Sequence, residues 1–435
     1  MLYVKRRKIC HPLICLKDIK KSVPKTFPDS VSLSKKSKQN DDEPEKNFIK
    51  RRNRVFTPIV FFCSIIKLVS TDSLDGIQIL LDDLFSNDLG VVPPSDSALS
   101  QFRNTVSYNF FKDIFINAVN SLRNYIPKYK GFRFFGLDGD QYHLPRSKDV
   151  LNNNYNGYPL SDGKETYSPV MYTVTATELM TGAPVDFYYS ITNNEILGAL
   201  EMVKKSNKKD VFVYDRFYYS KELVDAHTKA GNYFIIRLRR GGVPNEFMDF
   251  FISDKPESTV FINNQKLRIV NAGFDSDGGP IFLLTNLPKS IFSWQQIGIL
   301  YNRRWRSETG NRETTSSLSL DHFHGRDLNK ILQEIYACLW LKFSSAVLTT
   351  SEISYETFFT EKEYKMPNMK EVLRLFQSKL LDILNNKNIL FCVDMFKKII
   401  RRSTEKRRHN SRSYPKEVSY KRKKTFPTKI VERNS

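Results

Sequence analysis

The residues best suited to chemistry lie in the segment from Tyr301 to Glu308, which reads YNRRWRSE. At 100° per residue, Tyr301, Arg304 and Glu308 fall within about 60° of one another on one helical face. A carboxylate beside a guanidinium and a phenol suits a phosphodiester held next to a divalent cation. The carboxylate would bind the metal, and the other two groups would bind phosphate oxygens. An ordinary exposed, charged helix is the alternative interpretation of this segment alone.

Two further carboxylates follow apolar runs elsewhere in the chain. Residues 131–140 (GFRFFGLDGD) reach Asp138 and are then expected to turn at Gly139, and residues 209–215 (KDVFVYD) end in Asp215. Both runs are typical of buried strands that deliver an Asp at the C-terminal edge of a sheet, where α/β sites usually lie. Two strand-end aspartates and a helical glutamate make the acidic trio that two-metal phosphoryl transfer requires.

Two assignments near these aspartates stay open. Asp140 could replace Asp138 as a metal ligand, although Asp138 is preferred because it ends the apolar run and precedes a glycine. Arg216 and Tyr218 lie just past the second metal Asp, and they are equally plausible as DNA contacts and as packing residues.

Strand and helix signals alternate in the part of the chain that must position both aspartates. Strands are expected at 132–138, 168–176, 182–190, 210–214 and 233–238, and helices at 193–205 and 220–230. Two adjacent antiparallel strands followed by helix-linked strands describe a mixed sheet of ribonuclease-H type. The expected fold class is therefore α/β, with this sheet in a catalytic domain at 129–350.

The segments around this sheet have different patterns. Glycines and short β-rich runs indicate a β insertion at about 241–290, and the apolar spacing of 56–128 indicates a small helical domain. Helical patterns continue at 327–349 and through 351–400.

The net charge of +21 is concentrated at the two ends of the chain. Residues 1–55 carry 16 Lys/Arg and 6 Asp/Glu, and residues 397–435 carry 15 and 3, whereas the remaining 341 residues have a net charge of −1. Clustered basic ends are typical of proteins that bind a polyanion, most often nucleic acid. A solubilising or nuclear-targeting segment is the alternative. We expect 1–55 to be mostly disordered and 401–435 to be a basic tail.

Cysteine usage and hydropathy indicate the cellular compartment in which we expect the protein. The five cysteines are scattered and odd in number, which favours a reducing compartment without disulfides. No run approaches the ~18 consecutive apolar residues of a membrane span. We expect a cytoplasmic, nucleoid-associated protein with no membrane partner.

On these motifs the chain resembles the DDE transposases of insertion sequences, typified by insertion sequence 4. Their third acidic residue lies in the pattern Tyr-x2-Arg-x3-Glu-x6-Lys, which Tyr301, Arg304 and Glu308 match in register, while Thr315 occupies the Lys position. Nearby Arg312 shares this helical face and is expected to supply the missing charge, with a solvated surface role as the alternative.

The two aspartate motifs extend the resemblance. The segment 137–139 (LDG) is similar to the first family motif, and 215–220 (DRFYYS) is similar to the second, although Phe217 stands where Gly is usual. The run 232–240 and the stretch from 56 to 103 also resemble the family, so that the similarity covers roughly residues 55 to 350.

The resemblance implies a function and a set of partners. It implies a DNA transposase that cuts and joins DNA at transposon ends, with Asp138, Asp215 and Glu308 holding two Mg²⁺ ions, or Mn²⁺ in their place. Tyr301 and Arg304 would contact a phosphate. The domain at 56–128 would help to bind the terminal inverted repeats, and a homodimer would act on paired ends and target DNA. A metal-dependent nuclease and a decayed or domesticated copy that only binds DNA are the alternatives.

Overall fold

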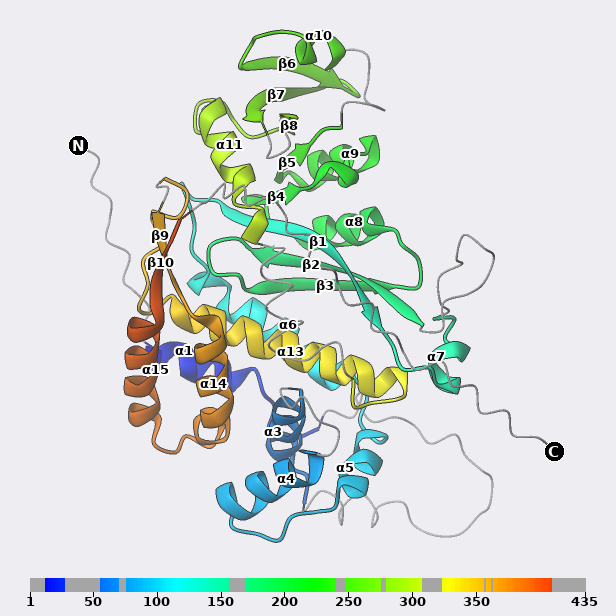
Figure 1. Cartoon of the computed structure of the whole chain (residues 1–435), viewed down its shortest axis with the longest axis vertical. Coiled ribbons are helices and arrows are strands. Elements are labelled where there is room, and N and C mark those ends of the chain that lie inside the picture. Colours follow the sequence, from blue (N-terminus) through cyan, green and yellow to red (C-terminus); the bar gives the residue numbers. More distant parts are fainter. Residues whose placement is uncertain are drawn as a thin grey trace, which may run out of the picture.

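The computed structural model describes residues 12–27, 55–69, 76–155, 169–239, 247–274, 279–306, 323–355, 357–360 and 363–408. Its centre is an eight-stranded mixed sheet with the order β3-β2-β1-β4-β5-β8-β7-β6 (Figure 1). The strands are β1 (Arg133–His143), β2 (Val170–Glu178), β3 (Pro184–Ser190), β4 (Asp210–Tyr214), β5 (Tyr233–Arg237), β6 (Glu257–Ile262), β7 (Gln265–Phe274) and β8 (Pro280–Thr285).

The connections between strands follow the expected mixed topology. β1, β2 and β3 form an antiparallel meander, and β4 and β5 are parallel to β1. Helix α8 (Glu195–Lys205) leads into β4, and α9 (Lys221–Ala230) connects β4 to β5. The β-rich segment that follows adds β8, β7 and β6 to the same sheet, because β8 pairs antiparallel with β5. The expected mixed α/β fold is therefore confirmed, and the β insertion lengthens the main sheet.

The expected turn at Gly139 is wrong. β1 continues to His143, and Gly139 lies within the strand opposite Val174 of β2. The apolar run does end near Asp138, because residues 133–137 are all buried while residues 138–140 are partly exposed. The loss of apolar character thus marks the end of the continuously buried part of the strand and not the end of the strand itself.

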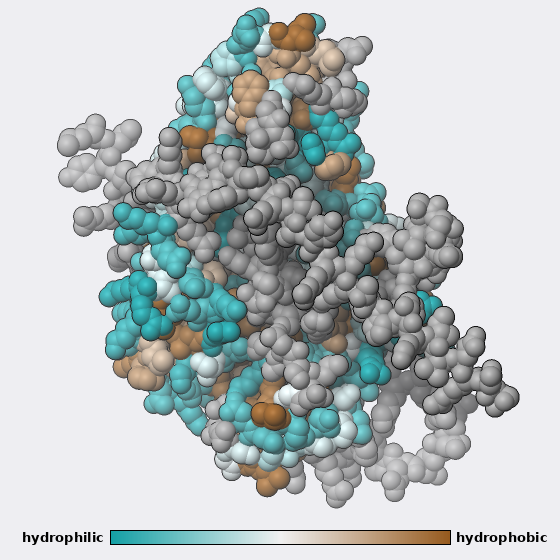
Figure 2. Space-filling model, in the orientation of Figure 1, coloured by the Kyte–Doolittle hydropathy of each residue, from teal (hydrophilic) through white to brown (hydrophobic). Residues whose placement is uncertain are grey.

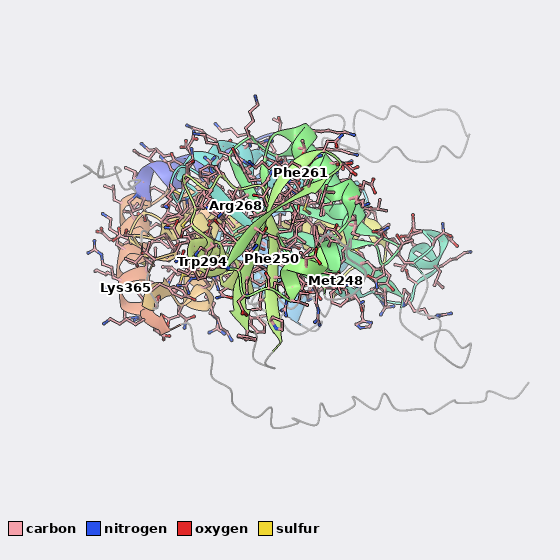
Figure 3. The ribbon with its side chains drawn as sticks, turned by 90° about the horizontal axis from the view of Figure 1, so that it is seen from above. Met248, Phe250, Phe261, Arg268, Trp294 and Lys365 are labelled. Carbon is pink, nitrogen blue, oxygen red and sulfur yellow. The ribbon has the colours of Figure 1, made fainter. Side chains whose placement is uncertain are left out.

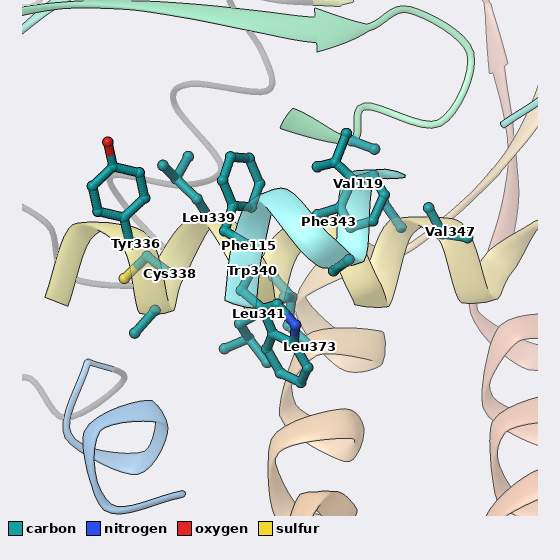
Figure 4. Packing of buried hydrophobic residues seen from close by; sticks show 14 of the residues in the cluster. Phe115, Val119, Tyr336, Cys338, Leu339, Trp340, Leu341, Phe343, Val347 and Leu373 are labelled. Carbon is teal, nitrogen blue, oxygen red and sulfur yellow. The ribbon is translucent and has the colours of Figure 1, made fainter. Parts of the chain in front are cut away.

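One long helix, α13 (Leu328–Thr349), lies along a face of the sheet and forms the centre of the helical layer (Figure 1). It is long and apolar enough to cross a membrane, but the whole apolar window is buried inside the protein. A helix that is apolar on all sides is typical of a domain core. Figure 4 shows Trp340 and Phe343 of α13 among side chains of α6 (Asn109–Leu122) and α14 (Met369–Leu384).

Within the described residues, the helices before the sheet share one core with the rest of the helical layer. Their buried side chains join those of α13 and of one sheet face in a single cluster. The other helical elements on this side are α3 (Pro58–Leu68), α4 (Ile77–Asp82), the π-helix η3 (Asp83–Asp88), α5 (Asp96–Arg103) and the 3₁₀-helix η4 (Arg123–Tyr125). The short helix α7 (Lys148–Asn152) follows β1.

Part of the N-terminal segment, residues 12–27, belongs to the described fold. Helix α1 (Pro12–Lys21) buries Cys15, Leu16 and Ile19 against the helical layer, while Lys20 and Lys21 occupy its last turn. The Nε1 of Trp340 donates to Ser22 Oγ at 3.0 Å. The apolar side chains of this segment therefore stabilise a docked helix despite the high net charge around them.

The C-terminal region also extends further than expected. β9 (Glu363–Pro367) pairs antiparallel with β10 (Thr404–Arg408), and between them α14 is followed by α15 (Ile389–Ser403). Residues 401–408 thus belong to the described fold, and the rest of the expected tail lies outside the described residues. Around α14 and α15 the described surface is mostly hydrophilic (Figure 2).

A buried ion pair connects α5 to α13. Arg103 Nη2 lies 2.6 Å from Glu334 Oε1, and both side chains are less than 5% exposed. Glu334 also accepts hydrogen bonds from the backbone N–H groups of His324 and Gly325, at 3.0 and 2.9 Å. Burial alone would raise the pKa of Glu334, but the charge of Arg103 and the contacts with His324 hold it below its ordinary value. The pair therefore fastens the chain just after residue 322 to the core.

We expect Arg103→Met to lower the free energy of unfolding by roughly 3–5 kcal/mol at neutral pH, because it leaves an uncompensated buried carboxylate. Urea unfolding of full-length protein measures this. The low pKa of Glu334 stabilises wild type above about pH 4.5, and this contribution is lost as the pH falls through the folded-state pKa. The difference between wild type and variant should therefore shrink in acid. The control is Arg402→Met, which breaks the exposed pair with Glu371 and should change little. Equal losses in both variants would contradict this assignment.

Candidate active site

The register between two parallel strands brings the two sequence-predicted aspartates together. β1 pairs with β4 from Arg133↔Asp210 to Gly136↔Val213. Continued by two residues, the same register sets Asp138 beside Asp215. Neighbouring strands lie about 4.8 Å apart. Asp215 immediately follows β4 with an extended backbone (φ −74°, ψ 171°), so the register is not interrupted there.

Both aspartates project from the same face of the sheet. Phe134 of β1 and Val213 of β4 contribute to the core under α6 and α13, whereas Phe135 and Phe212 contribute to the core under α8 and α9. Because side chains alternate along a strand, Asp138 and Asp215 lie on the face of α6 and α13. Both are partly exposed, at the point where the buried part of the sheet ends.

The register also bears on the choice between Asp138 and Asp140. Asp140 lies two residues further along β1, past the last residue of β4, and its Oδ1 accepts a hydrogen bond from Gln141 N at 2.8 Å. Asp138 is the residue aligned with Asp215. The geometry therefore favours Asp138 as the partner of Asp215.

Tyr301 and Arg304 bring a phenol and a guanidinium near Asp215. Tyr301 lies near the end of α11 (Trp294–Asn302) and is 6% exposed, while Arg304 is 8% exposed. Burial raises the pKa of Tyr301; the charge of Arg304 opposes this shift, Asp215 adds to it and Arg237 opposes it. These groups are therefore electrostatic neighbours. The structure brings together Asp138, Asp215, Tyr301 and Arg304 and adds Arg237.

The expected continuous helix from Tyr301 to Glu308 is wrong. α11 ends at Asn302, residues 303 and 304 form a turn, and helical geometry resumes at Trp305. Tyr301 and Arg304 remain close because the turn is tight, with Arg304 N donating to Tyr301 O at 2.8 Å. The expected positions of Glu308, Arg312 and Thr315 lie outside the described residues.

Two anchors fix α11 and the turn that follows it. Ser293 and Gln296 form a capping box at the start of the helix. Arg268 of β7 donates to the carbonyls of Leu287 and Phe292, each at 3.0 Å, and so ties the sheet to the loop before α11. Figure 3 shows Arg268 and Trp294, at the beginning of α11, from above.

A third anchor lies beyond the turn. Arg306 is 7% exposed, and its Nη2 donates to Thr181 O at 3.4 Å. Burial raises the pKa of nearby Glu178 to about 7, although hydrogen bonds from Thr181 and Met180 and the charge of Arg306 oppose the shift. Arg306 thus holds the segment that continues toward Glu308 against the loop between β2 and β3.

Arg216 and Tyr218 have different environments. Both belong to the short 3₁₀-helix η5 (Arg216–Tyr218), but Arg216 is exposed and Tyr218 is 2% exposed. The burial of Tyr218 favours the packing role among the two alternatives for this residue. Arg216 remains available at the surface.

Phe217 was noted in the sequence only as a departure from a motif. It is 58% exposed, and the Arg239 guanidinium lies 4.2 Å from its ring centroid. Together with Arg216 and Arg237 they line a cleft of about 380 Å³ beyond the ends of β4 and β5. An exposed aromatic ring among arginines is typical of surfaces that bind single-stranded nucleic acid. The run of arginines at 237–240 was the available sequence signal.

The sequence did not predict the position of Glu195. It is the first residue of α8, and its carboxylate lies over Gly139, on the sheet face opposite to the side chain of Asp138. The only sequence signal is a glycine directly after Asp138, since nothing in the spacing relates it to residue 195.

The carboxylates of Asp138 and Asp215 are candidate ligands for a metal ion. Within the described residues, no three His, Cys, Asp or Glu side chains are already close enough to hold one. Asp138 and Asp215 supply carboxylate oxygens, which Mg²⁺ and Mn²⁺ prefer. The two residues fit such an ion as part of a larger set, and Glu308 lies outside the described part of the chain.

Comparisons with known proteins bear on this site. Residues 141–341, just under half of the chain, match a family model described as "Transposase DDE domain". The matched range contains Asp215, Tyr301, Arg304 and Glu308 and begins three residues after Asp138. The match supports a DDE transposase domain in this segment and the corresponding class of enzyme.

The chain matches no curated protein. Among solved structures, the chain is similar to piggyBac transposase in its synaptic complex with hairpin DNA, at 14% identity and a TM-score of 0.43. That alignment covers 91% of this chain and 86% of the other.

We expect Phe217→Ala to weaken binding of a short single-stranded oligonucleotide by roughly 1–3 kcal/mol, because one stacking surface is lost. Fluorescence anisotropy with a labelled oligonucleotide measures the dissociation constant. The matched control is Phe261→Ala on β6, which removes an equally exposed phenylalanine (63%) outside the cleft and should leave binding unchanged. If the two variants bind alike, the cleft does not stack bases.

Proposed function

We propose that the protein is a DNA transposase of the insertion sequence 4 type, because residues 141–341 match a family model described as "Transposase DDE domain". It would hydrolyse a DNA strand at the end of its element and join the freed 3′ hydroxyl to target DNA. The observation that carries this proposal is the register that sets Asp138 beside Asp215. Tyr301 and Arg304, on the segment that leads to Glu308, add the phosphate-binding groups.

The strand arrangement supports a ribonuclease-H type of catalytic domain. The antiparallel strands β3, β2 and β1 are followed by the parallel strands β4 and β5, which are joined through α8 and α9. This arrangement delivers both aspartates at one edge, where sites of open α/β sheets usually lie.

Asp138, Asp215 and Glu308 would hold two Mg²⁺ ions, or Mn²⁺ in their place. When bound, such ions would activate the attacking hydroxyl and stabilise the leaving oxygen. Arg304 would bind a phosphate oxygen through a charge-assisted hydrogen bond. Tyr301 would donate its hydroxyl to the same phosphate, since burial keeps the phenol protonated. In the same function, Arg312 would supply the charge that Thr315 lacks.

The DNA partners would be the terminal inverted repeats of the element and its target, bound by a homodimer on paired ends. Arg216, Phe217 and Arg239 lie at the end of β4 and β5 next to Asp215, and they would hold the strand that leaves the site. The basic ends of the chain would bind the phosphate backbone without sequence preference. A cytoplasmic, nucleoid-associated location is part of this proposal.

We expect Asp138→Asn, Asp215→Asn and Glu308→Gln each to lower DNA cleavage at least about 100-fold, because each change removes a metal ligand. DNA affinity should stay near that of wild type. Cleavage and joining are measured with labelled duplexes that carry the DNA flanking this reading frame, together with a target plasmid. Asp140→Asn is the matched control and should retain activity.

The products also separate the alternative functions. Cleavage without joined products would favour a metal-dependent nuclease. DNA binding with neither cleavage nor joining in wild type would favour a decayed copy, and recovery of activity by Thr315→Lys would trace that decay to the missing lysine. Wild-type cleavage by any one of the three variants would remove that residue from the site.

A second prediction concerns the basic C-terminus. Residues 409–435 carry 8 Lys/Arg and 2 Asp/Glu. We expect their deletion to weaken binding to duplexes of any sequence and to flatten the dependence of log K on log salt, because fewer counterions are released. The described fold, which ends at Arg408, should keep its thermal stability. An unchanged salt slope would show that this segment does not contact phosphates.

A further inference from the structure

We propose that Arg303 is a positioning residue of this site. Its guanidinium is held by the rings of Phe358 and Tyr364, which we call the aromatic cage, and it fixes the turn that places Tyr301 and Arg304 near Asp215. This inference rests on the proposed function, and it adds a residue that would act through Tyr301 and Arg304.

The backbone of Arg303 lies at the point where α11 ends. Its N–H donates to the carbonyls of Ile299 and Leu300 at 3.3 and 3.2 Å, and its own carbonyl accepts a hydrogen bond from Arg306 N at 3.0 Å. One residue therefore joins α11 to the helical geometry that resumes at Trp305. A displacement of Arg303 would move the chain on both sides of the turn.

The side chain of Arg303 is fixed by the aromatic cage. It is 5% exposed, and its Cζ lies 4.6 Å from the ring centroid of Tyr364 and 5.1 Å from that of Phe358. The two ring centroids are themselves 4.9 Å apart. A guanidinium at such distances from aromatic rings forms cation–π interactions, which are strongest where water is excluded. The cage therefore favours one position of the guanidinium.

The aromatic cage is also packed against the strand that carries the first aspartate. Phe358 lies 4.9 Å from Phe359, and Phe359 lies 5.0 Å from Phe134 of β1, measured between ring centroids. Phe134 is four residues before Asp138, so both side chains project from the same face of the sheet. This series of packed rings sets the position of Arg303 relative to β1.

A purely structural role is the alternative for Arg303, because a buried, paired cation destabilises the fold wherever it is removed. Arg123 provides the comparison. It forms an ion pair with buried Asp210 at the start of β4, at the opposite end of this strand from Asp215. Loss of either arginine should lower stability, but only loss of a positioning residue should change how Arg304 acts on Tyr301.

Tyr301 reports the position of Arg304 in the absence of DNA and metal. Burial raises the pKa of Tyr301, and the charge of Arg304 opposes this shift. Fluorine NMR of full-length protein labelled with 3-fluorotyrosine follows the titration, and Tyr301→Phe assigns the resonance. We expect Arg304→Ala to raise the pKa of Tyr301, and to raise it less in an Arg303→Ala background, where Arg304 is no longer held in place.

The matched background is Arg123→Met, in which Arg304→Ala should keep its full effect on Tyr301. An effect of equal size in the Arg303→Ala and wild-type backgrounds would overturn the positioning role. A pKa of Tyr301 that does not respond to Arg304→Ala in wild type would contradict the proximity on which the proposal depends.

Two variants of the aromatic cage repeat the test if Arg303→Ala does not fold. Tyr364 is half-buried on β9. Tyr364→Leu removes one ring and should reduce the effect of Arg304→Ala on Tyr301, whereas Tyr364→Phe retains the ring and should preserve that effect. If both variants preserve it, the cage does not position Arg304.

Cleavage rates separate this proposal from the proposed function. We expect Arg303→Ala to lower kcat for DNA cleavage, per folded molecule, about tenfold or more with little change in KM, because misplacing a positioned group by about 1 Å costs up to about 100-fold. Arg304→Ala should lower kcat at least as much. Wild-type kcat in Arg303→Ala, with kcat lost in Arg304→Ala, would overturn the positioning role alone. Wild-type kcat in Arg304→Ala would contradict the phosphate contact of the proposed function.

Discussion

The site depends on the parallel pairing of β1 with β4. That pairing has one register over four residue pairs, and its continuation sets Asp138 beside Asp215 on one face. A shift of one residue in β4 would turn Asp215 toward α8 and α9 and replace it with a side chain from the other face. The buried alternation of Phe134, Phe135, Phe212 and Val213 between two cores resists such a shift. Packing on both faces of the sheet therefore determines the chemistry at its edge.

The rest of the fold holds α11 and the turn after it, which carry Tyr301 and Arg304, against the sheet edge that carries Asp138 and Asp215. Arg268 fastens the loop before α11, Arg306 fastens the chain after the turn, and the Arg103–Glu334 pair fastens the chain where it is described again at residue 323. Each anchor is a guanidinium that is buried or half-buried and is bound to a carbonyl or a carboxylate. Because such groups are strongly destabilising when unpaired, they favour one position of the described chain on either side of residues 307–322.

The sequence predicted the strands that carry the aspartates because both faces of those strands are buried, which makes their apolar runs continuous. It failed where tertiary contacts override local signals. The predicted turn at Gly139 is wrong, because this residue lies within β1 and its lack of a side chain leaves room for Glu195. The break at 303–304 lies where Arg303 and Arg304 are buried, and no glycine or proline marks it. The position of Glu195 over Gly139 has no signal in the sequence, because only the folded sheet brings the start of α8 to this strand.

The central claim is that Asp138 and Asp215 act together on one metal centre. Anomalous diffraction from crystals of the full-length protein grown with Mn²⁺ tests this most directly. The account predicts anomalous peaks within about 2.0–2.6 Å of carboxylate oxygens from both aspartates. Ions that contact neither residue, or only one of them, would contradict it.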